Sequence, residues 1–181
     1  MRRRELIALC LSLAVVLRCG AYAGPPSEYE VKAVFLFNFS QFVSWPPAAF
    51  DRSNAPMIIA VLGSDPFGQE LDAVVRGEHL GEHPLEVRRY HDVSEVKDCH
   101  ILFIDRSEAS RLAGIVQALR GRSILTVSDI DNATGAGVMI DLVKQSDRIR
   151  LRINVAAARA GGLTISSKLL RPAEIVGSAE G

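Results

Sequence analysis

The sequence predicts an α/β fold, a three-layer sandwich with a mostly parallel central sheet and an antiparallel C-terminal strand pair. Short, continuous apolar runs such as 57–62 and 100–105 are typical of strands buried on both faces. An amphipathic stretch, 108–119, follows the second run, and this alternation builds parallel sheets covered by helices. The last two strands, 138–143 and 149–155, are separated by a hairpin-sized gap, so we expect them to be antiparallel.

The first 23 residues resemble a secretory signal peptide. Arg2–Arg4 form a positive start, residues 6–17 form an apolar core too short to span a bilayer comfortably, and Ala21–Ala23 form an A-x-A cleavage site. Arg18 disfavours the alternative of a lipoprotein attached at Cys19, and an uncleaved anchor is the other alternative. We therefore expect a single periplasmic domain, residues 24–181, with no membrane insertion of the mature chain.

Charge and cysteine content limit the partners of this domain. Without residues 1–23 the chain has a net charge of about −3 and no basic cluster, which argues against nucleic-acid binding. Cys99 is then the single cysteine, so an internal disulfide cannot form. We expect Cys99 to be a buried apolar side chain, with a reactive or intermolecular thiol as the alternative.

The first element of the mature chain is an unusually apolar helix over residues 31–45, which we expect Pro46 and Pro47 to end. Its apolar residues lie on more than one side, which predicts burial on more than one side. One set comprises Val31, Val34, Phe35, Phe42 and Trp45, with Asn38 among them, and another comprises Leu36, Phe39 and Val43. We expect the second set either to pack under the C-terminal segment or to form the contact of a homodimer.

The remaining elements follow the same alternation. Ser64 or Asp65 is expected to cap a helix from Pro66 to about Arg76. We further expect an edge-like strand at 85–90, a helical turn at 94–98, a central strand at 100–105, a helix at 108–119, a strand at 124–127, a turn at 131–137, a short helix at 155–160 and a last apolar segment at 163–176.

Candidate catalytic and cofactor sites are weak. Gly63–Gly68 has the spacing of a phosphate loop, but Gln69 and Glu70 stand where that loop needs Lys and Ser or Thr. His79 and His83 are four residues apart, yet Gly81 and Pro84 predict a loop between and after them rather than a metal-binding helix. No nucleophile elbow is present. We therefore expect a binding or regulatory protein with no cofactor, no metal site and no enzymatic activity.

Acidic residues follow three predicted strands at the edge where open α/β sheets bind ligands. They are Asp65, Asp105 and Asp129, and helix capping or turn formation explains them best. A receiver-like magnesium pocket is disfavoured, because the Gly63-Ser64 pair precedes the first acid and an exported chain lacks phosphodonors. A small-molecule sensor is the alternative function, with a cleft near Ser64, Asp65, Phe67, Asp105, Ser107 and Ser128.

The C-terminal segment combines apolar residues with flanking cations, a composition common at the rims of interfaces. It either packs one face on the sheet or docks a partner. The candidate partner-binding residues are Ile165, Lys168, Leu169, Leu170, Arg171 and Ile175.

Four stretches together resemble the YfiR-like family of periplasmic regulators: 28–39 with 42–46, 61–68 (VLGSDPFG), 99–104 (CHILFI), and 153–154 through 162–171 (GLTISSKLLR). The resemblance implies a repressor that binds the periplasmic sensor domain of an inner-membrane diguanylate cyclase and keeps cyclic di-GMP, and with it biofilm formation, low. Some relatives carry a disulfide in the mature domain, which this chain cannot form internally.

Overall fold

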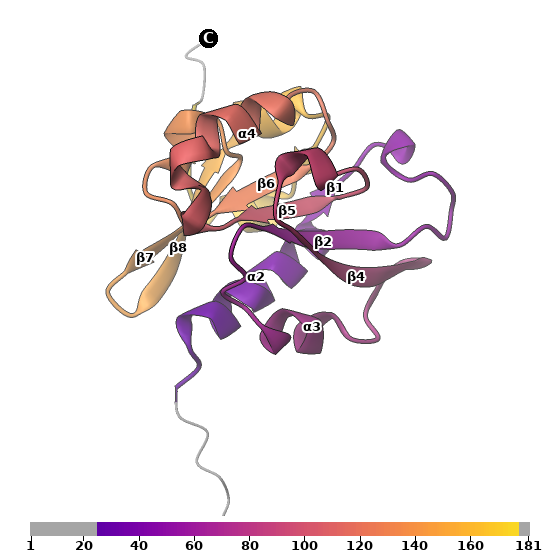
Figure 1. Cartoon of the computed structure of the whole chain (residues 1–181), viewed down its shortest axis with the longest axis horizontal. Helices are drawn as coiled ribbons and strands as arrows, with labels where there is room; N and C mark the ends of the chain where they lie inside the picture. Colours follow the sequence, from indigo (N-terminus) through magenta and orange to yellow (C-terminus); the bar gives the residue numbers. More distant parts are fainter. Residues whose placement is uncertain (1–24, 178–181) are drawn as a thin grey trace, which may run out of the picture.

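The main sheet has eight strands in the order β10-β8-β7-β6-β5-β2-β4-β3 (Figure 1). We describe residues 25–177 of a computed structural model, so the predicted signal peptide and residues 178–181 lie outside the described part. The strands are β2 (Met57–Leu62), β3 (His79–Leu80), β4 (His83–Tyr90), β5 (Ile101–Ile104), β6 (Leu125–Ser128), β7 (Ile140–Gln145), β8 (Arg148–Asn154) and β10 (Glu174–Val176). A separate antiparallel pair joins β1 (Val43–Ser44) to β9 (Thr164–Ile165).

Most neighbouring strands of the main sheet are parallel, and the exceptions lie toward its two ends. β7 pairs with β8, and β3 pairs with β4, in antiparallel register. The expected parallel α/β sheet with an antiparallel C-terminal pair is therefore confirmed. The run 100–105 forms the central strand β5, between β2 and β6, because its side chains are apolar on both faces and must be covered on both.

Helices cover the sheet on both sides (Figure 1). α2 (Glu28–Phe42) and α3 (Gln69–Val75) lie on one face, where Leu36, Phe39 and Leu71 pack against β2, β5 and β6. α4 (Leu112–Ala118) lies on the other, where Leu112 and Ile115 pack against the alternate side chains of the same strands. Two short helices, α5 (Val155–Ala160) and α6 (Ser167–Leu170), complete the C-terminal part. None of the helices between residues 25 and 177 has the length and apolar character that crossing a bilayer requires.

The first helix ends earlier than expected. Ser27 caps its start in a reciprocal arrangement with Glu30, which satisfies backbone N–H groups that the first turn leaves free. The helix stops at Phe42 rather than at Trp45, because Val43 and Ser44 leave it to pair with Ile165 and Thr164. A long-range strand contact, rather than Pro46, sets this boundary.

The helix after β2 also begins later than expected. It starts at Gln69 behind Gly68, not at Pro66, and neither Ser64 nor Asp65 caps it. Asp65 Oδ1 instead accepts a hydrogen bond from Phe67 N at 2.8 Å, which forms a local turn. The expected helix at 108–119 is split into a 3₁₀ segment, Arg106–Arg111, and α4.

Candidate functional site

The residues predicted to line a ligand cleft lie at or beyond the carboxyl ends of β2, β5 and β6, but their polar groups bond within the protein. Ser64 N donates to Ser107 Oγ at 3.0 Å, and Ser107 N donates to Asp105 Oδ2 at 2.8 Å. Ser128 Oγ donates to Ile104 O at 2.8 Å. These contacts tie one strand end to the next, so the polar groups brace the edge of the sheet.

Phe67, the aromatic residue of the predicted cleft, is buried in the core. Its ring packs edge-on against Tyr29 at 5.5 Å and against Phe103 at 4.8 Å between centroids. It therefore fixes the 63–68 loop on the sheet and under α2. None of the six predicted cleft residues lines a pocket described below.

A buried ion pair lies at the same edge, one residue beyond Ser128. Lys32 Nζ of α2 donates to Asp129 Oδ2 at 2.5 Å, and both side chains are inaccessible to solvent. Tyr29 OH donates to the same oxygen at 3.0 Å, and the Lys32 ammonium lies 4.4 Å from the Tyr29 ring centroid. Removing one partner of such a pair usually costs about 3–5 kcal/mol, because the other charge stays buried without compensation.

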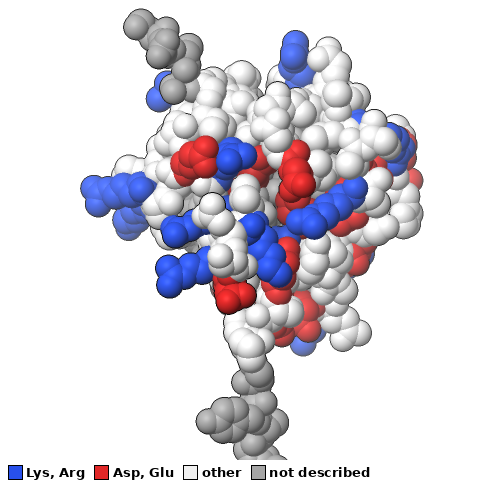
Figure 2. Space-filling view, turned by 90° about the vertical axis from the view of Figure 1, so that its left-hand side faces the viewer, with Lys and Arg blue, Asp and Glu red and all other residues white. Residues whose placement is uncertain are grey.

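Charged residues surround this pair. Glu28 bonds to Lys32 at 2.5 Å and to Lys144 of β7 at 2.9 Å, so it bridges α2 to the β7–β8 hairpin. Arg106 Nε donates to the Asp129 carbonyl at 3.2 Å. Figure 2 shows this face of the molecule, where basic and acidic side chains alternate instead of forming a field of one sign.

The pKa values of Glu28 and Tyr29 are both shifted by the charged groups around the Lys32–Asp129 pair. The hydrogen bonds from Lys32 and Lys144 lower the pKa of Glu28 to about 2, which keeps this carboxyl ionised. Burial, followed by the charge of Asp129, raises the pKa of Tyr29 to about 12, which keeps its hydroxyl a donor. Tyr29 therefore holds Asp129 throughout the physiological pH range.

A pocket of about 210 Å³ opens beside the buried pair. Asp129 and Asp141 line it, together with Arg106, Lys144 and Arg152. Asp141 Oδ2 accepts from Thr134 N at 3.1 Å and from Thr134 Oγ1 at 3.0 Å. Burial raises the pKa of Asp141. Polar groups of both signs thus converge on a pocket that the predicted cleft missed.

One apolar face of α2 is buried and the other is partly exposed. Leu36, Phe39 and Val43 are 0%, 0% and 5% exposed in the chain's own core. They leave no surface for a second copy, which favours the core over the dimer contact for these three residues. The uncovered face is the other one: Val34 is 46% exposed, and Val31 and Phe35 line a shallow pocket of about 350 Å³ beside it.

The candidate partner-binding residues are divided between core and surface. Leu169 is buried, Leu170 packs partly against the core and Ile165 belongs to the β1–β9 pair, so these three hold the C-terminal segment in place. Lys168 and Arg171 are exposed, and Ile175 is 42% exposed on β10. Among the described strands, β10 pairs with β8 alone and lies at an edge of the sheet.

An aromatic cluster built on Phe50 lies at the amino ends of β4 and β5. Its ring stacks on His83 at 4.0 Å and on His100 at 4.4 Å between centroids. His100 is buried, accepts from Ile58 N through Nδ1 and lies 3.1 Å from Ala49 O through Nε2, so neither ring nitrogen is free. Burial also lowers the pKa of His100, and the neutral ring acts as a structural link.

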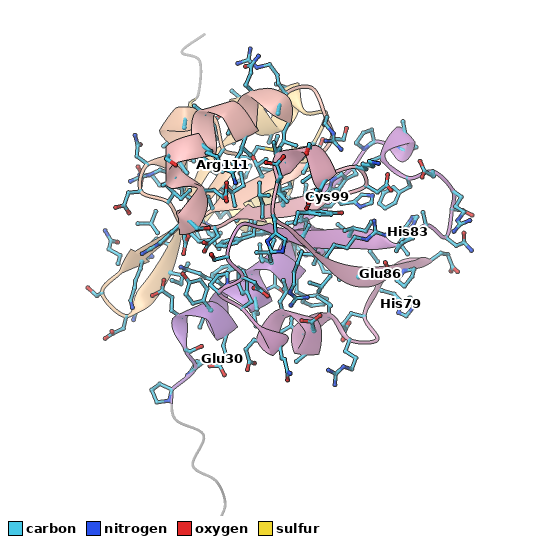
Figure 3. The ribbon with its side chains drawn as sticks, in the orientation of Figure 1. Glu30, His79, His83, Glu86, Cys99 and Arg111 are labelled. Carbon is cyan, nitrogen blue, oxygen red and sulfur yellow. The ribbon has the colours of Figure 1, made fainter. Side chains whose placement is uncertain are left out.

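His79 and His83 lie on the hairpin of β3 and β4 rather than in a loop, at the end of the molecule away from β7 and β8 (Figure 3). His83 Nδ1 contacts Ala55 O at 2.7 Å. Cys99, buried near this end, has its pKa raised to about 12 by burial. Among residues 25–177, no group of three or more His, Cys, Asp or Glu side chains could hold a metal ion.

Lys32 and Asp141 are the functional candidates that the sequence interpretation missed. Lys32 is a charged residue between Val31 and Ala33 in an apolar helix, which was a usable signal, because a buried lysine needs a partner. Asp141 interrupts the apolar run 138–143 in the same way. The sequence pattern marks Asp129 only as one of three acids at predicted strand ends.

A family model described as YfiR/HmsC-like matches residues 29–174, from the first turn of α2 to the start of β10. No curated protein matches the sequence.

Proposed function

Since the chain belongs to the YfiR/HmsC-like family, we propose that it is a periplasmic regulator that binds the sensor domain of an inner-membrane diguanylate cyclase. Binding holds the cyclase inactive and represses cyclic di-GMP synthesis, and release favours biofilm formation. The proposal takes residues 1–23 as the cleaved signal peptide that exports the domain.

The observation that carries the docking part of this proposal is the uncovered apolar face of α2. Among the described residues, Val34 and Ile175 are the large apolar side chains that stand out as exposed. Val34 lies with Val31, Phe35 and Pro26 around a shallow, almost wholly apolar depression. Contiguous apolar surface of this kind commonly marks a protein interface.

A non-catalytic mode of action is supported by the state of the candidate reactive groups. His100 uses both ring nitrogens in backbone contacts, and the Cys99 thiol is buried with a raised pKa. Catalysis needs titratable groups that converge and remain free to exchange protons. Binding and releasing a partner requires neither convergent titratable groups nor proton exchange.

The edge strand β10 is a second docking surface in this proposal. Ile175 is exposed there, and Lys168 and Arg171 are exposed on the segment that precedes it. An open strand edge can pair with an extended segment of a partner. Leu169 and Leu170 are poor test positions, because their substitution by Asp would disturb the core.

Affinity capture of the cyclase's periplasmic domain tests the proposal. We expect the wild-type chain to retain the domain, Val34→Asp to lose most capture, and the exposed α3 variant Ala73→Asp to retain it. Ile175→Asp tests in the same way whether β10 takes part in docking. Failure of the folded wild type to capture the domain, or to lower cyclic di-GMP in cells expressing the cyclase, would overturn the function.

The same variants test the predicted homodimer. Light scattering after gel filtration gives the mass of each variant in solution. A wild-type dimer that Val34→Asp dissociates would assign the α2 face to a second copy, and the cyclase would then dock elsewhere. A monomeric wild type that loses capture on Val34→Asp assigns the face to the cyclase.

A further inference from the structure

The β7–β8 hairpin runs beyond the strands that flank it. β6 pairs with β7 only up to Asp141, and β10 pairs with β8 only from Arg152 onward. The two hairpin strands pair with each other as far as Gln145 and Arg148. Residues 142–151 therefore form a two-stranded ribbon that extends from the sheet with no flanking strand among those described (Figure 1).

The outer edge of β8 is consequently open over residues 148–151. In an antiparallel pair, alternate residues point their backbone N–H and C=O groups away from the partner strand. β10 takes up such groups from Arg152 onward, but none of the described strands does so before it. An extended segment of another chain can pair with an open edge of this kind and continue the sheet, which is a common mode of peptide recognition.

A depression of about 270 Å³ lies along this open edge. It is lined by Arg150, Leu151 and Arg152 of β8, by Val143 and Gln145 of β7, and by residues 171–174, which lead into β10. The depression thus borders the part of β8 that β10 leaves unpaired, where the next strand of a longer sheet would lie.

Arginines dominate the side chains of this edge. Strand alternation places Arg148, Arg150 and Arg152 on one face of β8, at intervals of roughly 7 Å along the strand. Because Ile149 and Leu151 separate them, they form no basic run in the sequence. The strand gathers on one face what the sequence keeps apart.

Most of the cations at this edge are available to a partner. Arg152 is paired with Glu174, at 3.3 Å between Nε and Oε1. Asp147 is exposed in the hairpin turn, and Asp141 is buried. Three arginines are exposed and form no ion pair with another described residue: Arg148, Arg150 and Arg171. The edge therefore carries more positive than negative charge.

This charge disfavours a second copy and indicates an acidic partner. An antiparallel pair of two β8 edges would place arginines against arginines, and like charges opposite each other destabilise a strand pair. The free edge of β7 suits an acidic segment less, because the pocket beside it is lined by Asp129, Asp131 and Asp141. A strand with an acid at every second position would set its carboxylates against the arginines of β8 and its other side chains beside Ile149, which packs partly against the core.

We propose that the free edge of β8, residues 148–151, binds an extended acidic segment of a partner protein as an added strand, with its carboxylates on the arginine face. Backbone hydrogen bonds supply affinity, and the carboxylates supply selectivity. Salt screens exposed charges, so binding weakens as the ionic strength rises. The residues of this edge are distinct from those of the apolar α2 face, and the binding does not depend on the proposed regulatory function.

Fluorescence anisotropy with labelled peptides tests the proposal on the purified protein. The probe is a capped heptapeptide in which Val and Glu alternate. One control peptide has Lys in place of each Glu. A second keeps every Glu but has N-methylated backbone amides, which removes the donors that strand pairing needs. We expect saturable binding of the Val/Glu peptide, weakened by salt, and no binding of either control.

Arg150→Glu identifies the edge. It reverses one exposed charge of the arginine face, and we expect the affinity for the Val/Glu peptide to fall at least about tenfold, which corresponds to about 1.4 kcal/mol. Arg120→Glu is the matched control, because it makes the same change of net charge at an exposed position just after α4, outside the hairpin. We expect Arg120→Glu to bind the peptide as the wild type does.

Four results would overturn the proposal: no peptide binding at millimolar concentration, equal binding of the Lys peptide, equal binding of the N-methylated peptide, or the same affinity in Arg150→Glu and Arg120→Glu. Equal binding of the N-methylated peptide would mean attraction of charge without strand pairing. Cosedimentation with phosphatidylglycerol vesicles, lost in Arg150→Glu and found in place of peptide binding, would assign the arginines to an anionic membrane instead.

Discussion

Lys32 in the first helix and Asp129 at the end of β6 are 97 positions apart and form a fully buried ion pair with an Nζ–Oδ2 distance of 2.5 Å. This contact joins the N-terminal helix to the carboxyl edge of the sheet. It also fixes the wall of the polar pocket, since Asp129 belongs to both.

Breaking this pair should destabilise the protein strongly. We expect Lys32→Met to lower the free energy of unfolding in urea by about 3–5 kcal/mol, because Asp129 would remain charged and buried. The double variant Lys32→Met with Asp129→Leu should lose less than the single variant, since no charge is left unpaired. A single variant as stable as the wild type would show that the pair is not closed in solution.

Acid should weaken the contact between α2 and the β7–β8 hairpin. The pKa of Glu28 is lowered to about 2 in the folded chain, mainly by Lys32 and Lys144. A lowered pKa of an acid stabilises the fold above the unfolded pKa, and this stabilisation is lost as the pH falls from about 4.5 toward 2. Unfolding curves over this range should show a smaller loss of stability for Glu28→Gln. Identical slopes in both proteins would contradict the prediction.

The two faces of α2 should respond differently to substitution. Phe39→Ala removes a fully buried ring and should cost about 3–5 kcal/mol. Val34→Thr, on the exposed face, should change the stability by no more than about 0.5 kcal/mol. Urea unfolding of both variants measures this contrast. A large cost for Val34→Thr would mean that a second copy covers the face.

Gly63 should not tolerate a side chain. Its φ of +99° disfavours any residue with a Cβ, and an added Cβ would approach Ser107 Oγ to 2.6 Å. We expect Gly63→Ala to destabilise the fold by about 1–3 kcal/mol. Adding Ser107→Ala should recover at most part of this cost, because the φ stays strained, Glu108 Cγ would still lie 2.9 Å from the added Cβ, and Ser64 N loses its acceptor. Full recovery in thermal unfolding would assign the cost to the clash alone.

Cys99 should be inert in the folded protein. The thiol is buried, and its pKa of about 12 leaves almost no thiolate at pH 8. Ellman's reagent should therefore label it only after unfolding in guanidinium chloride. Rapid labelling of the native chain would support the alternative of a reactive or intermolecular thiol.

Much of the sheet could be predicted, because its strands are marked by local pattern. β2 and β5 are continuous apolar runs, because a strand that is buried on both faces needs apolar side chains on both. Boundaries set by distant contacts were harder to predict. α2 ends at Phe42 because Val43 pairs with Ile165, a partner that no local signal identifies.

The candidate sites were less predictable than the fold. Ser64, Asp105, Ser107 and Ser128 do lie at the carboxyl edge, but their hydrogen bonds join protein groups to one another and brace the loops. Local sequence cannot tell a polar group that caps a turn from one that faces a pocket. Leu169 shows the same limit, since an apolar residue between cations suits either a rim or a core.

The sequence by itself determined the α/β class, the mostly parallel character of the central sheet and the resemblance to the YfiR-like family, because these depend on runs and spacings within short windows. The tertiary structure decided which apolar face of α2 is covered, and it brought Asp129, the partner of Lys32, and Asp141 to the lining of one pocket. Both faces of that helix are apolar, so periodicity could not show which of them is buried against the sheet. Only the packing of α2 on the sheet places Leu36 and Phe39 inside, leaves Val34 outside and closes the ion pair.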